Sequence, residues 1–96
     1  MDIWVTLRMT VRAGQFDGLS KFLDANLSRV RGFDGAQSVE LFFDEPSRAF
    51  LLHEAWQSRD HHQAYLAAIE ENGVMAQLMS FMEGAPDVTY YRKLDL

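Results

Sequence analysis

The side chains best able to do chemistry lie on or near residues 50–56, a short apolar segment that its composition and spacing predict to be a strand. Alternate residues of a strand share a face, so Glu54 and Trp56 are expected on the same buried face as Leu52. A buried carboxylate is costly unless it is paired. Glu54 is therefore either paired, for instance with an arginine or a backbone amide, or a carboxyl of raised pKa that acts as a base on a phenol or enol.

The aromatic residues nearby have two interpretations each. Trp56 can pack in the core at the wall of a pocket or stack against an aromatic substrate, and in either case its indole N–H needs a partner. Tyr65 is expected on the next helix and against the sheet, where it either lines the pocket or serves as a core aromatic. The sequence leaves these alternatives open.

The three histidines are placed poorly for a metal site. His61 and His62 are neighbours in the first turns of the predicted helix, so they point in different directions and at least one is expected at the surface. His53 lies on the opposite strand face from Glu54, so these two cannot share a metal. We therefore expect no metal site, and His62 remains a candidate base because a histidine readily exchanges protons near neutral pH.

A methionine-rich segment, residues 74–82, is predicted to form a short last helix. Methionine fills irregular gaps, so an ordinary role in the core is the favoured interpretation. The segment also follows Asn72 and Gly73, a natural hinge, and could cover the mouth of a pocket. In that case Met79 would contact a flat aromatic ligand.

The order of the predicted elements indicates the fold. Apolar residues alternate in the predicted strands and recur every three or four residues in the predicted helices. Gly32 is expected to end the first helix, and Ser58 to cap the second. The expected strands are residues 3–12, 36–43, 48–56 and 88–94, and the expected helices are residues 16–30, 59–71 and 74–82. This order predicts a single domain over residues 1–96 with an α+β, ferredoxin-like βαββαβ fold and a four-stranded antiparallel sheet.

Composition narrows the possible partners. The net charge is −5 and the basic residues are scattered, which argues against binding of nucleic acid. The chain has no cysteine, no signal-like start and no apolar run long enough to span a membrane, so a cytoplasmic protein without a membrane contact is expected. Hydrophobic residues make up 48% of the chain. Several apolar residues fall on the sheet face without helices: Trp4, Phe42 or Phe43, Leu51 and one of the two terminal tyrosines. A homodimer through this open face is therefore expected.

The order and spacing of these motifs resemble the antibiotic biosynthesis monooxygenase family of the dimeric α/β-barrel superfamily. The resemblance covers nearly the whole chain. It depends on the turn at residues 32–35, the strand pattern at residues 50–56, Ser58 at the start of the second helix, and Gly84 and Pro86 before the last strand. It implies a homodimer, with a pocket between sheet and helices in each subunit. Members of the superfamily catalyse different reactions, so the resemblance does not by itself fix the chemistry.

Two branches of the superfamily can be tested against single residues. In the anthrone-oxidising members an asparagine precedes the strand tryptophan by four residues and a tyrosine follows it by six; here these positions hold Leu52 and His62, while Trp56 is kept. The haem-degrading members need an asparagine on the first strand and a histidine on the later helix. The first strand has Leu7 near that place, and residues 74–82 contain no histidine, so haem binding is not expected.

The leading hypothesis is a cofactor-independent monooxygenase that oxidises a small aromatic substrate of the quinol or anthrone type with molecular oxygen. His62 or Glu54 would be the base, and the substrate would contact Trp56, Tyr65, Leu52 and Met79. One alternative is a non-catalytic dimeric domain that binds a small aromatic or hydrophobic ligand. The other is an isomerase or cyclase that uses the same base without oxygen.

Overall fold

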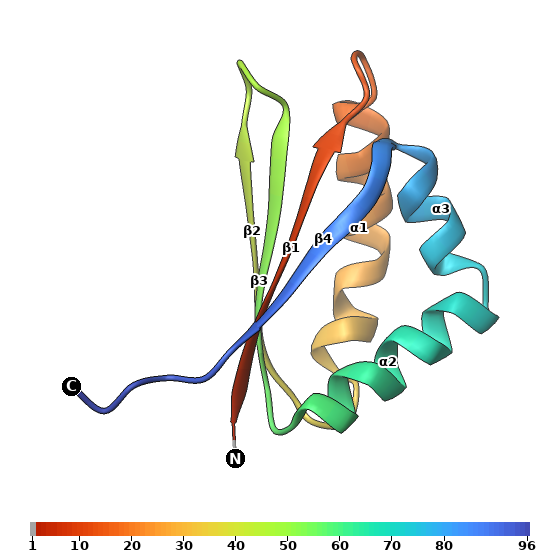
Figure 1. Ribbon diagram of the computed structural model, residues 1–96. Helices are drawn as coiled ribbons and strands as arrows, with labels where there is room; N and C mark the ends of the chain where they lie inside the picture. Colours follow the sequence, from red (N-terminus) through yellow and green to blue (C-terminus); the bar gives the residue numbers. More distant parts are fainter. Residues whose placement is uncertain (1) are drawn as a thin grey trace.

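The structure, a computed structural model, describes residues 2–96; residue 1 of the predicted domain lies outside the described residues. Along the chain its elements are β1 (Ile3–Val11), α1 (Phe16–Arg31), β2 (Ala36–Asp44), β3 (Ala49–Trp56), α2 (Arg59–Glu71), α3 (Val74–Ser80) and β4 (Met82–Tyr91) (Figure 1).

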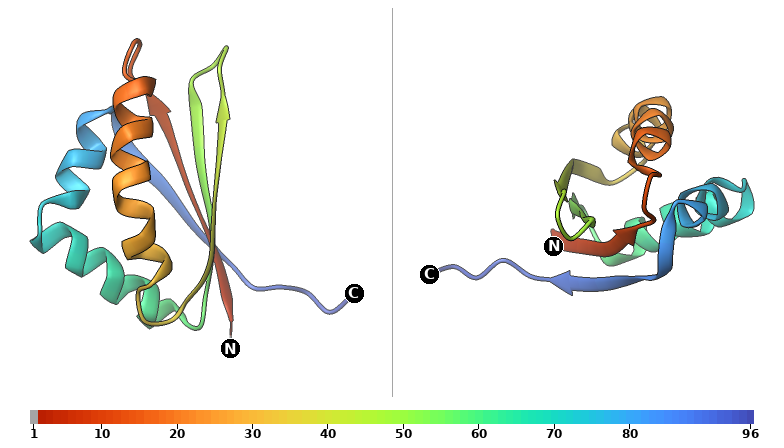
Figure 2. Two further views of the ribbon diagram at one scale, coloured as in Figure 1. Left: turned by 180° about the vertical axis from the view of Figure 1, so that it is seen from behind. Right: turned by 90° about the horizontal axis from the view of Figure 1, so that it is seen from above.

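The four strands form one antiparallel sheet in the order β2-β3-β1-β4. All three helices lie on the same side of this sheet (Figures 1 and 2). The predicted ferredoxin-like α+β fold is thus confirmed. Within one chain the sheet is open, and no helix among residues 2–96 covers its second face. The pairing of two sheets into a dimeric barrel therefore stays a prediction.

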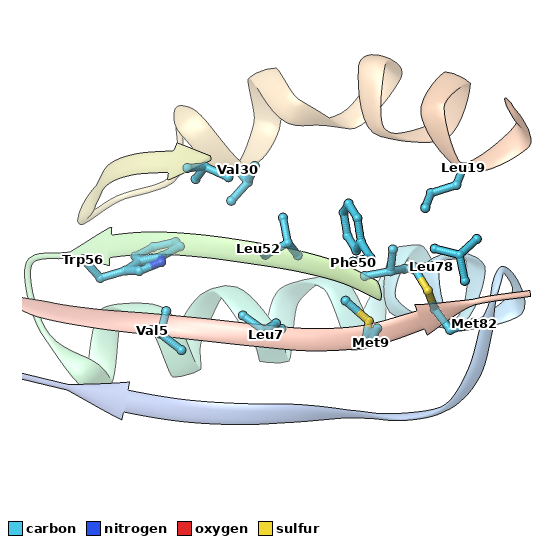
Figure 3. Close-up of a cluster of buried hydrophobic side chains, with 12 residues drawn as sticks. Val5, Leu7, Met9, Leu19, Val30, Phe50, Leu52, Trp56, Leu78 and Met82 are labelled. Carbon is cyan, nitrogen blue, oxygen red and sulfur yellow. The ribbon is translucent and has the colours of Figure 1, made fainter. Parts of the chain in front are cut away.

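The alternation in the strands decides which side chains enter the core. On β1 the helix-facing residues are Val5, Leu7, Met9 and Val11, all of them buried. On β3 the corresponding residues are Phe50, Leu52, Glu54 and Trp56. Figure 3 shows the labelled apolar side chains of both strands packed under α1, together with Leu19 and Val30 from that helix. The core therefore lies between the sheet and the helices, with one carboxyl group among its side chains.

The two predicted helix caps are confirmed. Gly32 caps α1, and its N–H donates to the carbonyl of Ser28 at 3.0 Å. Ser58 caps α2, and its hydroxyl accepts a hydrogen bond from the His61 backbone N–H at 3.1 Å. Gly35 has a φ of +88°, and a Cβ there would lie 2.5 Å from the His61 ring. A glycine is therefore needed at position 35 for two reasons, the backbone conformation and the close approach of α2.

The prediction for the end of the chain was wrong in its boundaries. α3 ends at Ser80, and β4 runs over Met82–Tyr91 instead of residues 88–94. Gly84 and Pro86, expected to break the chain before the strand, lie inside β4. Gly84 has a φ of +79°, and the pairing register with β1 shifts at this point. An edge strand tolerates such an irregularity and a proline without an N–H, because one side of it has no neighbouring strand to pair with.

Candidate functional site

Glu54 and Trp56 are each other's hydrogen-bond partner. The Trp56 indole N–H donates to Glu54 Oε1 at 2.8 Å, and the two residues are 0% and 3% exposed, respectively. The partner of the carboxyl is thus neither an arginine nor a backbone amide. Because residues two apart on a strand share a face, the sequence itself brings these two polar groups together. The bond gives the indole its partner and leaves the second carboxyl oxygen, Oε2, available to other groups.

His62 lies against the same carboxyl from the helix side. It is fully buried, its Nδ1 is 2.7 Å from the Tyr90 hydroxyl, and its Nε2 is 3.6 Å from Glu54 Oε1. That last distance is beyond a hydrogen bond, and within residues 2–96 Nε2 has no other partner. His61, by contrast, is half-buried and contacts Ser58, which agrees with the prediction that one of the two histidines lies toward the surface.

The sheet register explains why His62 can reach both partners. Val5 on β1 pairs with Glu54 on β3 and with Tyr90 on β4, so these three residues form a row across the sheet. His62 contacts the two outer members of the row, and Val5, the middle member, is short and fully buried. The imidazole from α2 therefore bridges two strands that are not neighbours.

Burial disfavours charge on both groups of this pair. It lowers the pKa of His62 to about 4. It also raises the pKa of Glu54, an effect that the hydrogen bond from Trp56 and the charge of His53 oppose in part. His62 is thus a neutral imidazole at neutral pH. Although its ring lies near a carboxylate, it does not form a charged ion pair there, because desolvation outweighs the attraction across 3.6 Å.

This pKa shift makes a prediction about stability. The unfolded chain binds a proton at His62 near pH 6.5, whereas the folded protein does so only near pH 4. The free energy of unfolding should therefore decrease as the pH falls through this window, by about 3 kcal/mol for the full shift. The raised pKa of Glu54 has the opposite effect on the free energy of unfolding. At pH values between the ordinary pKa and the raised pKa, the folded protein binds this proton more tightly than the unfolded chain, so stability increases as the pH falls.

Comparison with a His62→Gln variant isolates the contribution of His62. Urea unfolding of both proteins between about pH 7 and pH 4 measures it. We expect the wild type to lose stability relative to the variant as the pH falls. Parallel pH profiles would show that His62 is not held neutral by the fold.

Tyr65 joins this cluster to the space between the helices. Its ring lies 5.4 Å from that of Trp56 and 5.2 Å from that of Phe33. Burial, and next the negative charge of Glu54, raise the pKa of Tyr65 to about 12. It therefore stays a phenol at neutral pH and can act as a hydrogen-bond donor.

Two adjoining cavities lie beside the cluster. The inner one, of about 50 Å³, is lined by Leu52, Glu54 and Tyr65 together with Asn26 and apolar residues of β2 and the three helices. The outer one, of about 170 Å³, is lined by Phe33 and Tyr65 and by residues of α1 and α2. Glu54 is thus the acid–base group at the wall of a cavity, whereas His62 lines neither of the two and lies behind Glu54.

The structure brings together five of the six residues proposed from the sequence and separates the sixth. Glu54, Trp56, His62, Tyr65 and Leu52 are one cluster. Met79 instead lines an apolar groove against β4, together with Leu7 and Val88. Tyr90 and Phe33 were missed. Finding Tyr90 requires the register of β4 on β1, and no local pattern in the sequence supplies it.

Within the part of the chain that the structure describes, no group of three or more histidine, aspartate or glutamate side chains is placed to hold a metal ion. None of the described helices is long and apolar enough to cross a membrane.

Comparison with solved structures shows the same fold across the full length. A protein from Mycobacterium tuberculosis, Rv0793, is 23% identical with a TM-score of 0.83, covering 100% of this chain and 98% of its own. A conserved protein from Methanosarcina mazei is 12% identical with a TM-score of 0.86, covering 98% and 94%. A mutant of SnoaB, a cofactor-independent oxygenase from Streptomyces nogalater, is 10% identical with a TM-score of 0.81, covering 99% and 95%. At these identities the likeness establishes the fold alone.

Sequence comparison identifies the family. No curated protein matches the chain. The antibiotic biosynthesis monooxygenase model matches residues 3–70, well over half of the chain, from the first strand to the end of α2. This range includes the buried Glu54–Trp56 pair and His62. The chain therefore belongs to the antibiotic biosynthesis monooxygenase family.

Proposed function

We propose that this protein is a cofactor-independent monooxygenase that oxidises a small aromatic substrate of the quinol or anthrone type with molecular oxygen. The observation that carries the proposal is the position of Glu54, a buried carboxyl at the wall of a cavity with a neutral imidazole 3.6 Å behind it. Membership of a monooxygenase family supports the reaction class. The fold is shared with SnoaB, a cofactor-independent oxygenase, and this likeness supports the proposal.

Glu54 would be the base that meets the substrate. In this scheme it removes a proton from a phenol or an activated ring carbon, and the resulting anion reduces oxygen directly. One oxygen atom enters the substrate, which loses two hydrogens, and the other leaves as water. The ring would pack against Tyr65 and Leu52, with Trp56 holding the carboxyl in place. The protein would contribute orientation and a site without bulk water.

The size of the cavities favours a small ring. An apolar cavity of about 150 Å³ can hold benzene. The outer cavity, of about 170 Å³, is of this size, and its wall also contains the polar side chains of Asn26, Arg29 and Asn72. A single-ring quinol thus fits the space better than a three-ring anthrone. The inner cavity, of about 50 Å³, would admit the edge of the ring and the oxygen beside Glu54.

Oxygen consumption tests this function. Purified, metal-stripped protein should consume dissolved oxygen when it is given a panel of hydroquinones and anthrones, with single-ring quinols oxidised fastest. The expected result is enzyme-dependent uptake that heat-denatured protein lacks. If no member of the panel supports uptake, the oxygenase proposal fails.

One observation favours a non-catalytic binding domain as the second candidate. Leu52 places an apolar side chain at the cavity wall, where the anthrone-oxidising members carry an amide, so no amide at this position stabilises an anion. Ligand-induced quenching of tryptophan fluorescence without any product would support this candidate. Product formed without oxygen uptake would instead indicate the isomerase or cyclase.

We further propose that the protein is a homodimer through the open face of its sheet. Phe42 and Tyr91 are 51% and 50% exposed there, and each pairs across the strands with another apolar residue, Leu51 and Trp4 respectively. An exposed apolar patch of this kind is typical of an interface.

Sedimentation equilibrium should give the mass of a dimer, and Phe42→Glu should shift the protein toward the monomer. A monomeric wild type would refute this assembly. The cytoplasmic location stays a prediction.

A further inference from the structure

The Tyr90 hydroxyl does not line the cavity beside Glu54, yet it contacts His62, the most buried histidine of the chain. It lies 2.7 Å from Nδ1 of His62, and the two rings are edge to face at 5.4 Å. Tyr90 is half-buried on β4, an edge strand of the sheet. The guanidinium of the exposed Arg59 lies 4.5 Å from the centre of its ring. The phenol therefore stands between a fully buried imidazole and the edge of the sheet.

The three groups lie one after another between the inner cavity and that edge. Glu54 lines the inner cavity, His62 lies 3.6 Å behind it, and Tyr90 follows at 2.7 Å. Only the first gap exceeds a hydrogen bond, and such bonds are often long before a substrate is bound. Glu54 and Tyr90 belong to strands that are not neighbours, with Val5 of β1 between them. His62 connects the two because its imidazole spans Val5.

A hydroxyl is well suited to the outer position. A neutral imidazole carries its proton on either Nδ1 or Nε2, and the other nitrogen accepts. The Tyr90 oxygen can accept from Nδ1–H in one tautomer and donate to Nδ1 in the other. Either tautomer of His62 therefore keeps its hydrogen bond to Tyr90. A phenylalanine would fill the same space and would satisfy neither.

We propose that Tyr90 is a positioning residue that, through His62, connects Glu54 to solvent at the β4 edge as a path for protons. This inference rests on the proposed function, because it assumes that Glu54 takes a proton from a ligand in the cavity. It gives a role to the unpartnered Nε2 of His62, which faces the carboxyl.

The protons balance over one turnover. With Glu54 protonated, its proton passes to Nε2 of His62, the Nδ1 proton passes to the Tyr90 oxygen, and the phenol proton passes to water. Glu54 is then a carboxylate again, and His62 has changed tautomer. Running the path inward returns one proton to Glu54 and restores the first tautomer. The proposed reaction needs both directions, since a proton removed from the substrate is later returned to the reduced oxygen that leaves as water.

Tyr90→Phe tests the path, with Tyr91→Phe as the matched control. The first variant keeps the ring against His62 and removes only the hydroxyl. The second removes a hydroxyl from the next residue, which is 50% exposed and lies on the other face of the sheet. It keeps the aromatic ring that the proposed dimer interface would bury. For Tyr90→Phe we expect kcat to fall about tenfold or more, with KM unchanged and a larger solvent isotope effect. Unchanged kcat and an unchanged isotope effect in Tyr90→Phe would overturn the proposal.

Nitrogen NMR of the His62 ring separates this inference from the oxygenase proposal, because it needs no turnover. The Nδ1 resonance should shift in Tyr90→Phe and not in Tyr91→Phe. An unmoved Nδ1 resonance overturns the path whatever the activity. If the wild type consumes no oxygen, the proposed function fails, whereas a shifted resonance still supports a proton path from Glu54 for an oxygen-independent reaction.

Discussion

Glu54→Gln is expected to lower the turnover number about 10²–10⁴-fold, the range supplied by a positioned acid–base group, and to change KM little. Glutamine has the shape of the carboxyl, and its carbonyl oxygen can still accept the hydrogen bond from Trp56. The cavity wall should therefore keep its geometry, and the variant should lose only the ability to take a proton. Oxygen uptake with the best quinol of the panel measures the loss.

The matched control for this variant is Glu71→Gln. Glu71 is exposed at the end of α2 and lines neither the inner nor the outer cavity. The substitution makes the same change of charge. Its turnover should equal that of the wild type. Full turnover in Glu54→Gln would mean that the carboxyl is a structural partner of the indole and that the base is another group.

The half of the site on β3 could be predicted from the sequence because its information is local. Because residues two apart on a strand share a face, the strand over residues 50–56 places Glu54 and Trp56 together. Ser58 then fixes where α2 begins, and hence which histidine turns inward. The hydrogen bond between Trp56 and Glu54 could also be predicted in this way. The two residues are two apart on one strand face, and each needs a partner for a buried polar group, so the indole N–H can donate to the carboxyl.

The other half of the site depends on contacts between distant segments. Tyr90 meets His62 because β4 pairs with β1 in one particular register, and that register includes a shift near Gly84. Glycine and proline usually interrupt a strand, so the sequence pattern placed the start of β4 too late. The pattern contained no sign that this strand lies at the edge of the sheet, where both residues are tolerated.

Met79 shows a different limit. Its place on a short apolar helix was confirmed, but the direction of that helix is set by the chain reversal at Gly73, which has a φ of +85°. The angle between α2 and α3 decides whether Met79 points at the inner and outer cavities or at the apolar groove against β4. Residue spacing within one helix carries no information about that angle.

Trp56→Phe is expected to lower the free energy of unfolding by about 2–3 kcal/mol, because the buried Glu54 carboxyl loses its hydrogen-bond donor. The ring that remains still fills much of the space beside Tyr65 and Phe33. Urea unfolding measures the change. A double-mutant cycle with Glu54→Leu, which removes the acceptor, should give a coupling energy of about 1 kcal/mol or more between the two side chains. Strictly additive effects would show that the indole and the carboxyl are energetically independent.

Trp56→Phe should also raise the pKa of the Glu54 carboxyl. The hydrogen bond from Trp56 lowers the pKa of Glu54 against the larger effect of burial, so removing the donor should raise that pKa further. Titration of the Glu54 carboxyl carbon by NMR follows this directly. In the proposed reaction a protonated Glu54 cannot act as the base, so the acid limb of the pH–rate profile should move to higher pH by the same amount. If the pKa of Glu54 measured by NMR rises while the acid limb of the pH–rate profile stays in place, Glu54 does not take part in the rate-limiting proton transfer.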